Sequence, residues 1–384
     1  MGSRFAKKAG GLFLVPLMAF PFFCFTGSGT PASSTAGSVA EAARMHMARA
    51  SHTSTLLPNG KVLIAGGFGR SGTELKPYAS TELYDPQTGS FQPASGMTIG
   101  RSGHTATLLK NGKVLIVGGW TGQYDARRAA ELYDSTTGTF TPTGKMVNER
   151  SGSTATLLID GRVLVAGGVD RNENALGSAE LYDPATGTFT RTGDMTEPRG
   201  AHTATALKNG KVLIAGGGSG HYPSQTVYRS AELYDPGTGK FTSSGPMSVP
   251  RHKHAAVLLP SGKVLVVGGS DNKDWRGEYS SAEIYDPATG AFRATGAMSV
   301  SRFKLPEAVV SMDNGKVLVA GGGSFAEVYD ETRGTFSTVA GSLGAARFFA
   351  SATLLPHGRA LITGGYADTA GGLPSTASAW IYQP

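Results

Sequence analysis

One short stretch of sequence recurs along the whole chain and limits what the chain can fold into. It first reads GKVLIAGG, and the later copies differ from it at only a few positions. The seven copies begin at Gly60, Gly112, Gly161, Gly210, Gly262, Gly315 and Gly358. A repeat of roughly 50 residues is typical of one array of similar units, because each unit buries its apolar face against a neighbour. The 384 residues are therefore predicted to form one large repeat architecture rather than several unrelated domains.

The composition is that of a folded chain with many tight turns. Hydrophobic residues make up 40% of the sequence and charged residues only 16%, which is too apolar for a solvated coil. The 55 glycines therefore indicate turns rather than disorder.

Residues 1–29 differ from the repeats and have the features of a secretory signal peptide. Arg4, Lys7 and Lys8 precede the apolar run GLFLVPLMAFPFFCF, which Pro16 and Pro21 interrupt. Such a run is too short to favour a membrane-spanning helix. Residues 30–36 are a linker of small residues. We therefore expect the mature chain to have no transmembrane segment and to be secreted, periplasmic or held at the cell surface.

Charge and cysteine content exclude several classes of function. Loss of the leader lowers the formal net charge of +7 by three, and the remaining charge forms no basic stripe that would bind nucleic acid. The single cysteine, Cys24, also lies in the leader, and the bulky residues before it disfavour a lipid anchor there. The mature chain then has no thiol for a disulfide, for a metal or for catalysis.

Each repeat has the pattern of four short antiparallel strands. In the copy that starts at Met97, HTATLL alternates, NGK marks a tight turn, and KVLIVGG is apolar throughout, as in a strand covered on both faces. A loop, the segment AELYD, the turn STTG and a last strand from Phe140 follow. No segment has helical periodicity. The pattern predicts an all-β chain in which each repeat is one blade of a β-propeller.

The repeat resembles that of the kelch family, which has a glycine pair, then a tyrosine, then another aromatic residue. The pairs are Gly66 with Gly67, Gly118 with Gly119, Gly167 with Gly168, Gly216 with Gly217, Gly268 with Gly269, Gly321 with Gly322, and Gly364 with Gly365. The tyrosines with their partners are Tyr84 and Phe91, Tyr133 and Phe140, Tyr182 and Phe189, Tyr234 and Phe241, Tyr285 and Phe292, and Tyr329 and Phe336. The resemblance implies a seven-bladed propeller, distantly similar to the central domain of galactose oxidase. We expect the glycines to be structural, because a Cβ would block their backbone conformation or a close approach.

The seventh repeat stops before its fourth strand. It ends at SAWIYQP, while residues 37–45, ahead of the first repeat, have the pattern of an outer strand. We therefore predict that residues 37–384 form the propeller and that residues 37–45 complete the last blade, which leaves no unpaired edge at the closure.

The connections between strands fall into two sets that lie on opposite faces of the blades. Turns such as PNGK and DPATG are short and nearly uniform, whereas the loops after the glycine pairs vary greatly in length and carry aromatic residues beside polar ones. That mixture suits a sugar ring or a protein surface, so we predict binding on the variable face. The predicted binding residues in these loops are Trp120, Tyr124, Arg127, Tyr222, Tyr228, Trp275 and Tyr279. The alternative is that each aromatic residue only fixes its own loop to the blade.

An arginine recurs at the entrance to all seven blades, and a glutamate recurs in six of them. Arg–Glu pairing is the expected reason, and Trp380 replaces the glutamate in blade seven, which would leave Arg347 or Arg49 free for a ligand. Four blades also have a histidine three residues after the arginine. These histidines are consistent with a metal site or with structural hydrogen bonds, and we predict the second, with no metal and no cofactor.

Blade six departs most from the repeat. It reads RFKLPEAVV where blade two reads RSGHTATLL, and its variable loop is nearly deleted. Because repeats tend to break their pattern where a local function demands it, Lys304 and Glu307 are further predicted binding residues.

The features together predict an exported, monomeric binding module that recognises a glycan or a protein. One alternative is a carbohydrate-active enzyme of the epimerase or mutarotase kind, to which no catalytic residue is assigned. Oxidase chemistry of the galactose oxidase kind would need a cysteine crosslinked to a tyrosine beside copper, and the mature chain has no cysteine. The other alternative is a scaffold that only assembles proteins.

Overall fold

The computed structural model describes residues 36–71, 74–121, 128–221, 224–274, 277–367 and 374–384. The chain divides into two units, Met1–Ser34 and Thr35–Pro384. The predicted signal peptide, Cys24 and most of the predicted linker lie outside the described residues.

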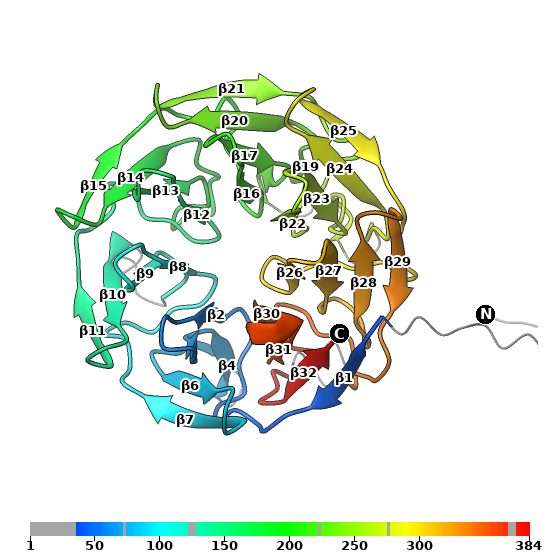
Figure 1. Cartoon of the computed structure of the whole chain (residues 1–384). Helices are drawn as coiled ribbons and strands as arrows, with labels where there is room; N and C mark the ends of the chain where they lie inside the picture. Colours follow the sequence, from blue (N-terminus) through cyan, green and yellow to red (C-terminus); the bar gives the residue numbers. More distant parts are fainter. Residues whose placement is uncertain (1–35, 72–73, 122–127, 222–223, 275–276, 368–373) are drawn as a thin grey trace, which may run out of the picture. The chain divides into compact units, whose positions relative to one another are not determined.

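The second unit is a seven-bladed β-propeller, as predicted, and its sheets succeed one another around a ring (Figure 1). Each blade is a four-stranded antiparallel sheet whose strands follow one another outwards from the centre. Blade one contains β2 (Thr53–Leu56), β3 (Val62–Ala65), β6 (Thr81–Asp85) and β7 (Ser90–Ala94). Blade two contains β8 (Thr105–Leu108), β9 (Val114–Val117), β10 (Ala130–Asp134) and β11 (Thr139–Pro142). Blade three contains β12 (Thr154–Leu157), β13 (Val163–Ala166), β14 (Ala179–Asp183) and β15 (Thr188–Arg191).

The remaining blades have the same organisation. Blade four contains β16 (Thr203–Ala206), β17 (Val212–Ala215), β20 (Ala231–Asp235) and β21 (Lys240–Ser244). Blade five contains β22 (Ala255–Leu258), β23 (Val264–Val267), β24 (Ala282–Asp286) and β25 (Ala291–Ala294). Blade six contains β26 (Val309–Ser311), β27 (Lys316–Val319), β28 (Glu327–Asp330) and β29 (Thr335–Thr338). Blade seven contains β30 (Ser351–Leu354), β31 (Ala360–Thr363), β32 (Ala379–Gln383) and β1 (Ser38–Glu41).

Short elements occur in some of the connections. They are the hairpin of β4 (Phe68–Ser71) and β5 (Glu74–Pro77), the hairpin of β18 (Gly218–Ser219) and β19 (Thr226–Val227), and the 3₁₀ turn η3 (Pro356–Gly358). Within the described ranges, no helix is long and apolar enough to cross a membrane.

The second strand of each blade is buried on both faces because it lies between two neighbouring blades. In blade one, Leu63 and Ala65 pack in one cluster with Val114, Ile116 and Tyr133 of blade two. This arrangement explains why the recurring VLIA segment is apolar at every position rather than at alternate ones. The hydrophobic core of the ring therefore lies between the blades rather than inside any single blade.

The ring closes as the sequence predicted. Strand β1 pairs antiparallel with β32, with Ser38 opposite Gln383 and Glu41 opposite Trp380, and Figure 1 shows it as the outermost strand beside the C-terminal strand. Val39 is buried in the adjoining core and its N–H donates to the carbonyl of Ala340 at 2.7 Å. The two ends of the ring are thus held in one sheet, which leaves β32 without an open edge.

The glycine pairs are structural, as predicted. Gly66 has a φ of +62°, and a Cβ built on it would lie 2.5 Å from the carbonyl oxygen of Arg101 in the next blade. Gly321 of blade six differs, since it lacks the positive φ and its Cβ would instead collide with the Ala308 side chain at 2.6 Å.

Candidate functional site: the variable-loop face and the central cavity

We call the face that carries the loops between the second and third strands of each blade the variable-loop face. The connections that lead from one blade to the next, with the recurring arginines, lie on the same face, because the strands of each blade are antiparallel. The opposite, short-turn face carries tight hairpins such as Asp85–Gly89 and Asp134–Gly138, each closed by a backbone hydrogen bond of 2.8 Å.

A buried Arg–Glu ion pair holds the variable-loop face in six blades of the described chain, as predicted from the sequence. The pairs, with their N–O distances, are Arg49–Glu82 at 2.9 Å, Arg101–Glu131 at 3.2 Å, Arg150–Glu180 at 2.9 Å, Arg199–Glu232 at 3.0 Å, Arg251–Glu283 at 3.1 Å and Arg302–Glu327 at 2.9 Å. These pairs are taken out of water, so removing one partner leaves the other charge uncompensated.

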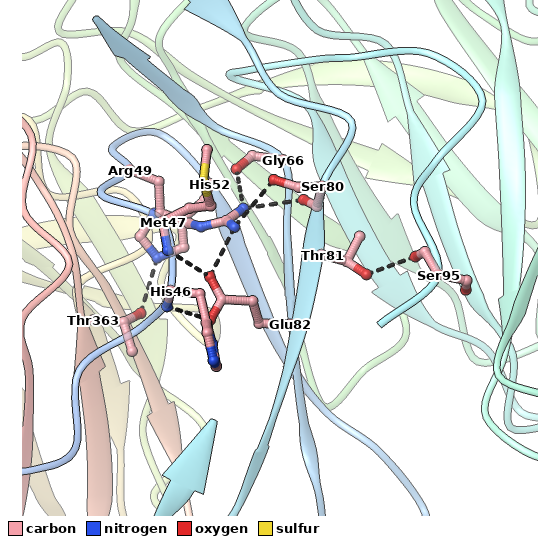
Figure 2. A network of polar contacts seen from close by, with 10 residues as sticks. All are labelled: His46, Met47, Arg49, His52, Gly66, Ser80, Thr81, Glu82, Ser95 and Thr363. Atoms are coloured by element: carbon pink, nitrogen blue, oxygen red, sulfur yellow. Dashed lines mark hydrogen bonds and ion pairs between the residues drawn. The ribbon is translucent and has the colours of Figure 1, made fainter. Parts of the chain in front are cut away.

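Figure 2 shows the polar contacts of one of these pairs, in blade one. Arg49 donates from Nη2 to Glu82 and from Nη1 to the Gly66 carbonyl at 2.7 Å. The Glu82 carboxylate also accepts the backbone N–H groups of His46 and Met47 on the segment that enters the blade. Burial lowers the pKa of Arg49, and the charge of Glu82 opposes that shift. The suggestion that Arg49 is free for a ligand was therefore wrong, because its guanidinium is buried and paired.

Arg347 is the arginine that differs. Trp380 of β32 replaces the glutamate, and the guanidinium lies over its ring at 5.4 Å from the centroid. Nε donates to the Leu343 carbonyl at 3.1 Å, and the described residues provide no hydrogen bond to its two Nη atoms. The side chain is half-buried, and burial lowers its pKa. Arg347 thus has no carboxylate partner among the described residues, and its role as a ligand-binding residue stays a prediction.

A collar of backbone hydrogen bonds surrounds the axis at the variable-loop face. Two residues after each recurring arginine the chain adopts a left-handed conformation, at Ser51, Gly103, Gly152, Ala201, Lys253, Lys304 and Phe349. These residues bond from blade to blade, for example Gly103 N to Ser51 O at 3.0 Å, Lys253 N to Ala201 O at 3.1 Å and Phe349 N to Lys304 O at 2.9 Å. Such a backbone costs about 1–2 kcal/mol per non-glycine residue, which the collar bonds offset. Sequence reasoning missed the collar because five of its seven described members are not glycine.

The four blade histidines make structural hydrogen bonds, as predicted. Each is buried, and each Nε2 lies within hydrogen-bond distance of a threonine hydroxyl, with distances of 2.8 Å for His52 and Thr363, 3.1 Å for His104 and Thr53, 3.1 Å for His202 and Thr154, and 3.0 Å for His254 and Thr203. Burial, together with the charges of nearby arginines, lowers the pKa of His104 and of His202 to about 3. These imidazoles are therefore neutral at ordinary pH. Among the described residues, no three His, Cys, Asp or Glu side chains gather as a metal ion would require.

A cavity of about 480 Å³ lies on the axis, lined by the first strands of the blades. Its wall consists largely of small residues and hydroxyl groups, and the four histidines form part of it. Glu307 and Lys253 also line the cavity. Lys253 is bonded to Asp274 at 2.8 Å. Although burial alone would raise the pKa of Asp274, hydrogen bonds from His252 and Lys253 lower it.

The two residues predicted from blade six have different environments. Lys304 is buried, its Nζ lies 2.7 Å from the Tyr366 hydroxyl, and it packs over the rings of Phe303 and Phe348. That placement favours a packing role for Lys304. Glu307 instead presents an exposed side chain to the axial cavity.

The loop aromatics that the structure describes are attached to their own blades. Arg199 lies over the ring of Tyr228 at 5.3 Å from the centroid and Arg251 over Tyr279 at 5.0 Å, and the hydroxyl of Tyr228 lies 2.6 Å from that of Ser219. Trp120 is half-buried at the start of its loop. Tyr124, Arg127, Tyr222 and Trp275 lie outside the described residues. The binding roles of all these residues stay predictions.

A signal in the sequence points to the stacking role of the tyrosines. Tyr78, Tyr228 and Tyr279 each precede the blade glutamate by four residues. The arginine that forms an ion pair with that glutamate lies over the ring of the tyrosine. A fixed spacing within the repeat indicates a structural contact, whereas ligand contacts need not repeat.

The chain belongs to the kelch-repeat family. The description KLHDC2/KLHL20/DRC7 Kelch-repeats domain matches residues 103–322, which is more than half of the chain. Comparison with curated protein sequences found no match.

Two solved structures show that the fold is shared with proteins of distant sequence. A structure described as a novel fungal alcohol oxidase with catalytic diversity among the AA5 family, in complex with copper, is 21% identical with a TM-score of 0.71, covering 91% of this chain and 76% of that chain. A structure described as YjhT is 14% identical with a TM-score of 0.54, covering 65% of this chain and 84% of that chain. Both resemblances concern the fold alone.

The described residues do not fit a copper centre of the kind that the first resemblance implies. Copper needs several converging nitrogen, sulfur or oxygen ligands, and the cavity histidines are each bonded separately to a hydroxyl. The only cysteine in the sequence is Cys24.

Proposed function

We propose that the protein is an exported binding module that recognises a protein or a glycan through its variable-loop face. The kelch propeller is a fold suited to protein interaction. One observation indicates which face binds the ligand. The turns of the short-turn face are nearly identical from blade to blade, whereas the loops of the other face differ in length and in structure, with hairpins in blades one and four and a short connection in blade six.

The rigidity of the face supports this proposal. Each of six described blades anchors the bases of its loops with a buried Arg–Glu pair and with backbone N–H groups on the glutamate. Loops on a rigid base can vary without disturbing the fold, which is the arrangement that repeat proteins use for recognition. Export is part of the proposal, and its support is the leader-like sequence of residues 1–29.

A glycan array probed with the purified protein tests the proposal. We expect a saturable signal that is reduced in Trp120→Ala or in Trp275→Ala, with unchanged melting temperatures. A blank array would direct the search to protein partners, by crosslinking with wild-type protein beside the same two variants. Failure of both experiments to find a ligand that depends on the variable loops would overturn the proposal.

Export and oligomeric state have tests of their own. We expect the mature chain to be recovered outside the cytoplasm without residues 1–29, and to be monomeric in sedimentation analysis. Retention of the leader on a cytoplasmic product would contradict the first expectation.

A further inference from the structure

Blade six contains two residues more than its neighbours between the recurring arginine and the glycine pair. In blades one to five the arginine lies 17 residues before the glycine carbonyl that it binds, and in blade six it lies 19 residues before it. Leu305 still takes the place of the blade histidine, since its Cδ1 would lie 2.8 Å from a Cβ on Gly268, as His254 Cε1 would from a Cβ on Gly216. The sheet resumes at Ala308, whose carbonyl accepts the Ala320 N–H at 2.9 Å.

The two additional residues are therefore Pro306 and Glu307, and they protrude into the central cavity. Leu305 and Ala308 on either side are fully buried, whereas Pro306 and Glu307 are exposed and both line the cavity of about 480 Å³. A two-residue insertion in the turn ahead of the innermost strand β26 thus places a carboxylate on the wall of the axial cavity.

The carboxylate of Glu307 is not neutralised by the protein. Within the described residues no hydrogen bond or ion pair reaches it, and it is the only acidic side chain on the described cavity wall. Lys253 is the only lysine or arginine of that wall, and it is bonded to Asp274. The histidines His52, His104, His202 and His254 face the same space, and burial lowers the pKa of each, so they supply no positive charge near neutral pH.

The blades that surround the cavity also change the pKa of the Glu307 carboxylate. The surrounding blades desolvate the carboxylate and raise its pKa. A cation beside it would oppose that shift, because an opposite charge favours the ionised carboxylate.

We propose that the axial cavity binds a small ligand through a protonated primary amine that pairs with Glu307. The volume lies within the range of sites for small molecules, roughly 300–1,000 Å³. The hydroxyl groups of Ser51, Thr105, Ser151 and Ser153 on the wall offer hydrogen bonds to the polar groups of such a ligand. This site is formed by the innermost strands and not by the variable loops, so it does not rest on the function proposed above.

Isothermal titration calorimetry with three primary amines tests the proposal. Glucosamine, ethanolamine and cadaverine are each titrated into the purified protein at neutral pH, beside N-acetylglucosamine, N-acetylethanolamine and N,N′-diacetylcadaverine. We expect at least one amine to bind saturably, and its acetylated form, which has no charge, to bind about tenfold more weakly or not at all. Absence of binding by all three amines, or equal binding by the neutral forms, overturns the proposal.

Two variants assign the binding to Glu307. Glu307→Gln keeps the shape of the side chain and should weaken binding of the amine about tenfold or more. Deletion of residues 306–307 restores the 17-residue spacing of the other blades and should abolish binding while the melting temperature stays near that of the wild type. Lys263→Met, on the short-turn face and outside the cavity wall, is the matched control and should bind the amine as the wild type does. Binding that survives both changes at blade six overturns the proposal.

Discussion

The two ends of blade five carry ion pairs of nearly the same length that differ in their surroundings. Arg251 and Glu283 on the variable-loop face are 3.1 Å apart with side chains 0% and 2% exposed. Lys263 and Asp286 on the short-turn face are 3.2 Å apart with side chains 47% and 29% exposed. Water screens the second pair, and the pKa of Asp286 is lowered first by the N–H of Ala288 and only then by Lys263. Ion-pair distance is therefore a poor guide to stabilisation, because burial decides what the loss of a partner costs.

The largest expected loss of stability is at blade seven, which has no buried Arg–Glu pair. Blade seven has Trp380 in place of the glutamate, so its closure depends on strand β1. Deletion of residues 37–45 would remove Val39 from the core and expose the edge of β32. We expect the melting temperature to fall by about 10 °C or more, as measured by differential scanning calorimetry. Deletion of residues 30–35 is the control, and an equal effect of the two deletions would contradict the assigned role of β1.

Substitution at the two ends of blade five tests the comparison directly. Arg251→Met leaves Glu283 buried without a charge partner and should lower the free energy of unfolding by about 3–5 kcal/mol. Lys263→Met should leave the unfolding midpoint unchanged within error, because Asp286 stays hydrated. Denaturant titration of both variants measures the difference. Arg347→Met should cost less than Arg251→Met, since no buried carboxylate depends on Arg347. Similar losses in Arg251→Met and Lys263→Met would refute the role of burial.

Two glycines of blade five extend the comparison to the backbone. Gly268 and Gly290 both have a φ of +66°, but a Cβ on Gly268 would lie 2.4 Å from the Arg302 carbonyl, whereas a Cβ on Gly290 would lie 3.7 Å from its nearest neighbour, Ser244 Oγ. Gly290→Ala should therefore lower the free energy of unfolding by about 1–2 kcal/mol, because alanine disfavours the left-handed backbone conformation. At position 268 overpacking should add about 1–3 kcal/mol. Equal unfolding free energies of the two alanine variants would contradict this.

The last prediction concerns the pH dependence of stability. His104 has a pKa of about 3 in the folded state, and an unfolded histidine has a pKa of about 6.5. Between these values the unfolded state binds one more proton, so stability falls as the pH falls from about 6.5 toward 3. His104→Ser, which copies Ser153 of blade three, should make this dependence shallower by about 1.4 kcal/mol per pH unit.

Denaturant titrations between pH 4 and pH 6 measure that slope. The double variant His104→Ser/His202→Ser should change it by about twice as much, because His202 has the same pKa in the folded state. An unchanged slope in both variants would show that these histidines are protonated in the folded protein.

Much of the fold could be predicted from the sequence because the residues that define a blade all lie within one repeat. The apolar VLIA segment, the glycine pair and the paired Tyr and Phe define a blade locally, and the short seventh repeat together with the strand-like residues 37–45 predicts the closure. The Arg–Glu pairs were predictable for the same reason, since both partners recur with the repeat.

The sequence by itself determined the blades, their number and the face on which they differ, because these properties depend on residues close together in the chain. Only the tertiary structure decided which residues reach the axis. The collar through Ser51 and Phe349 depends on contacts between blades at opposite ends of the sequence. Glu307 meets the cavity because a two-residue insertion ahead of β26 places it on the cavity wall. Lys304 occupies the collar position of its blade, and its side chain lies against Tyr366. Neither outcome depends on local pattern, since both arise only when seven blades enclose a common space.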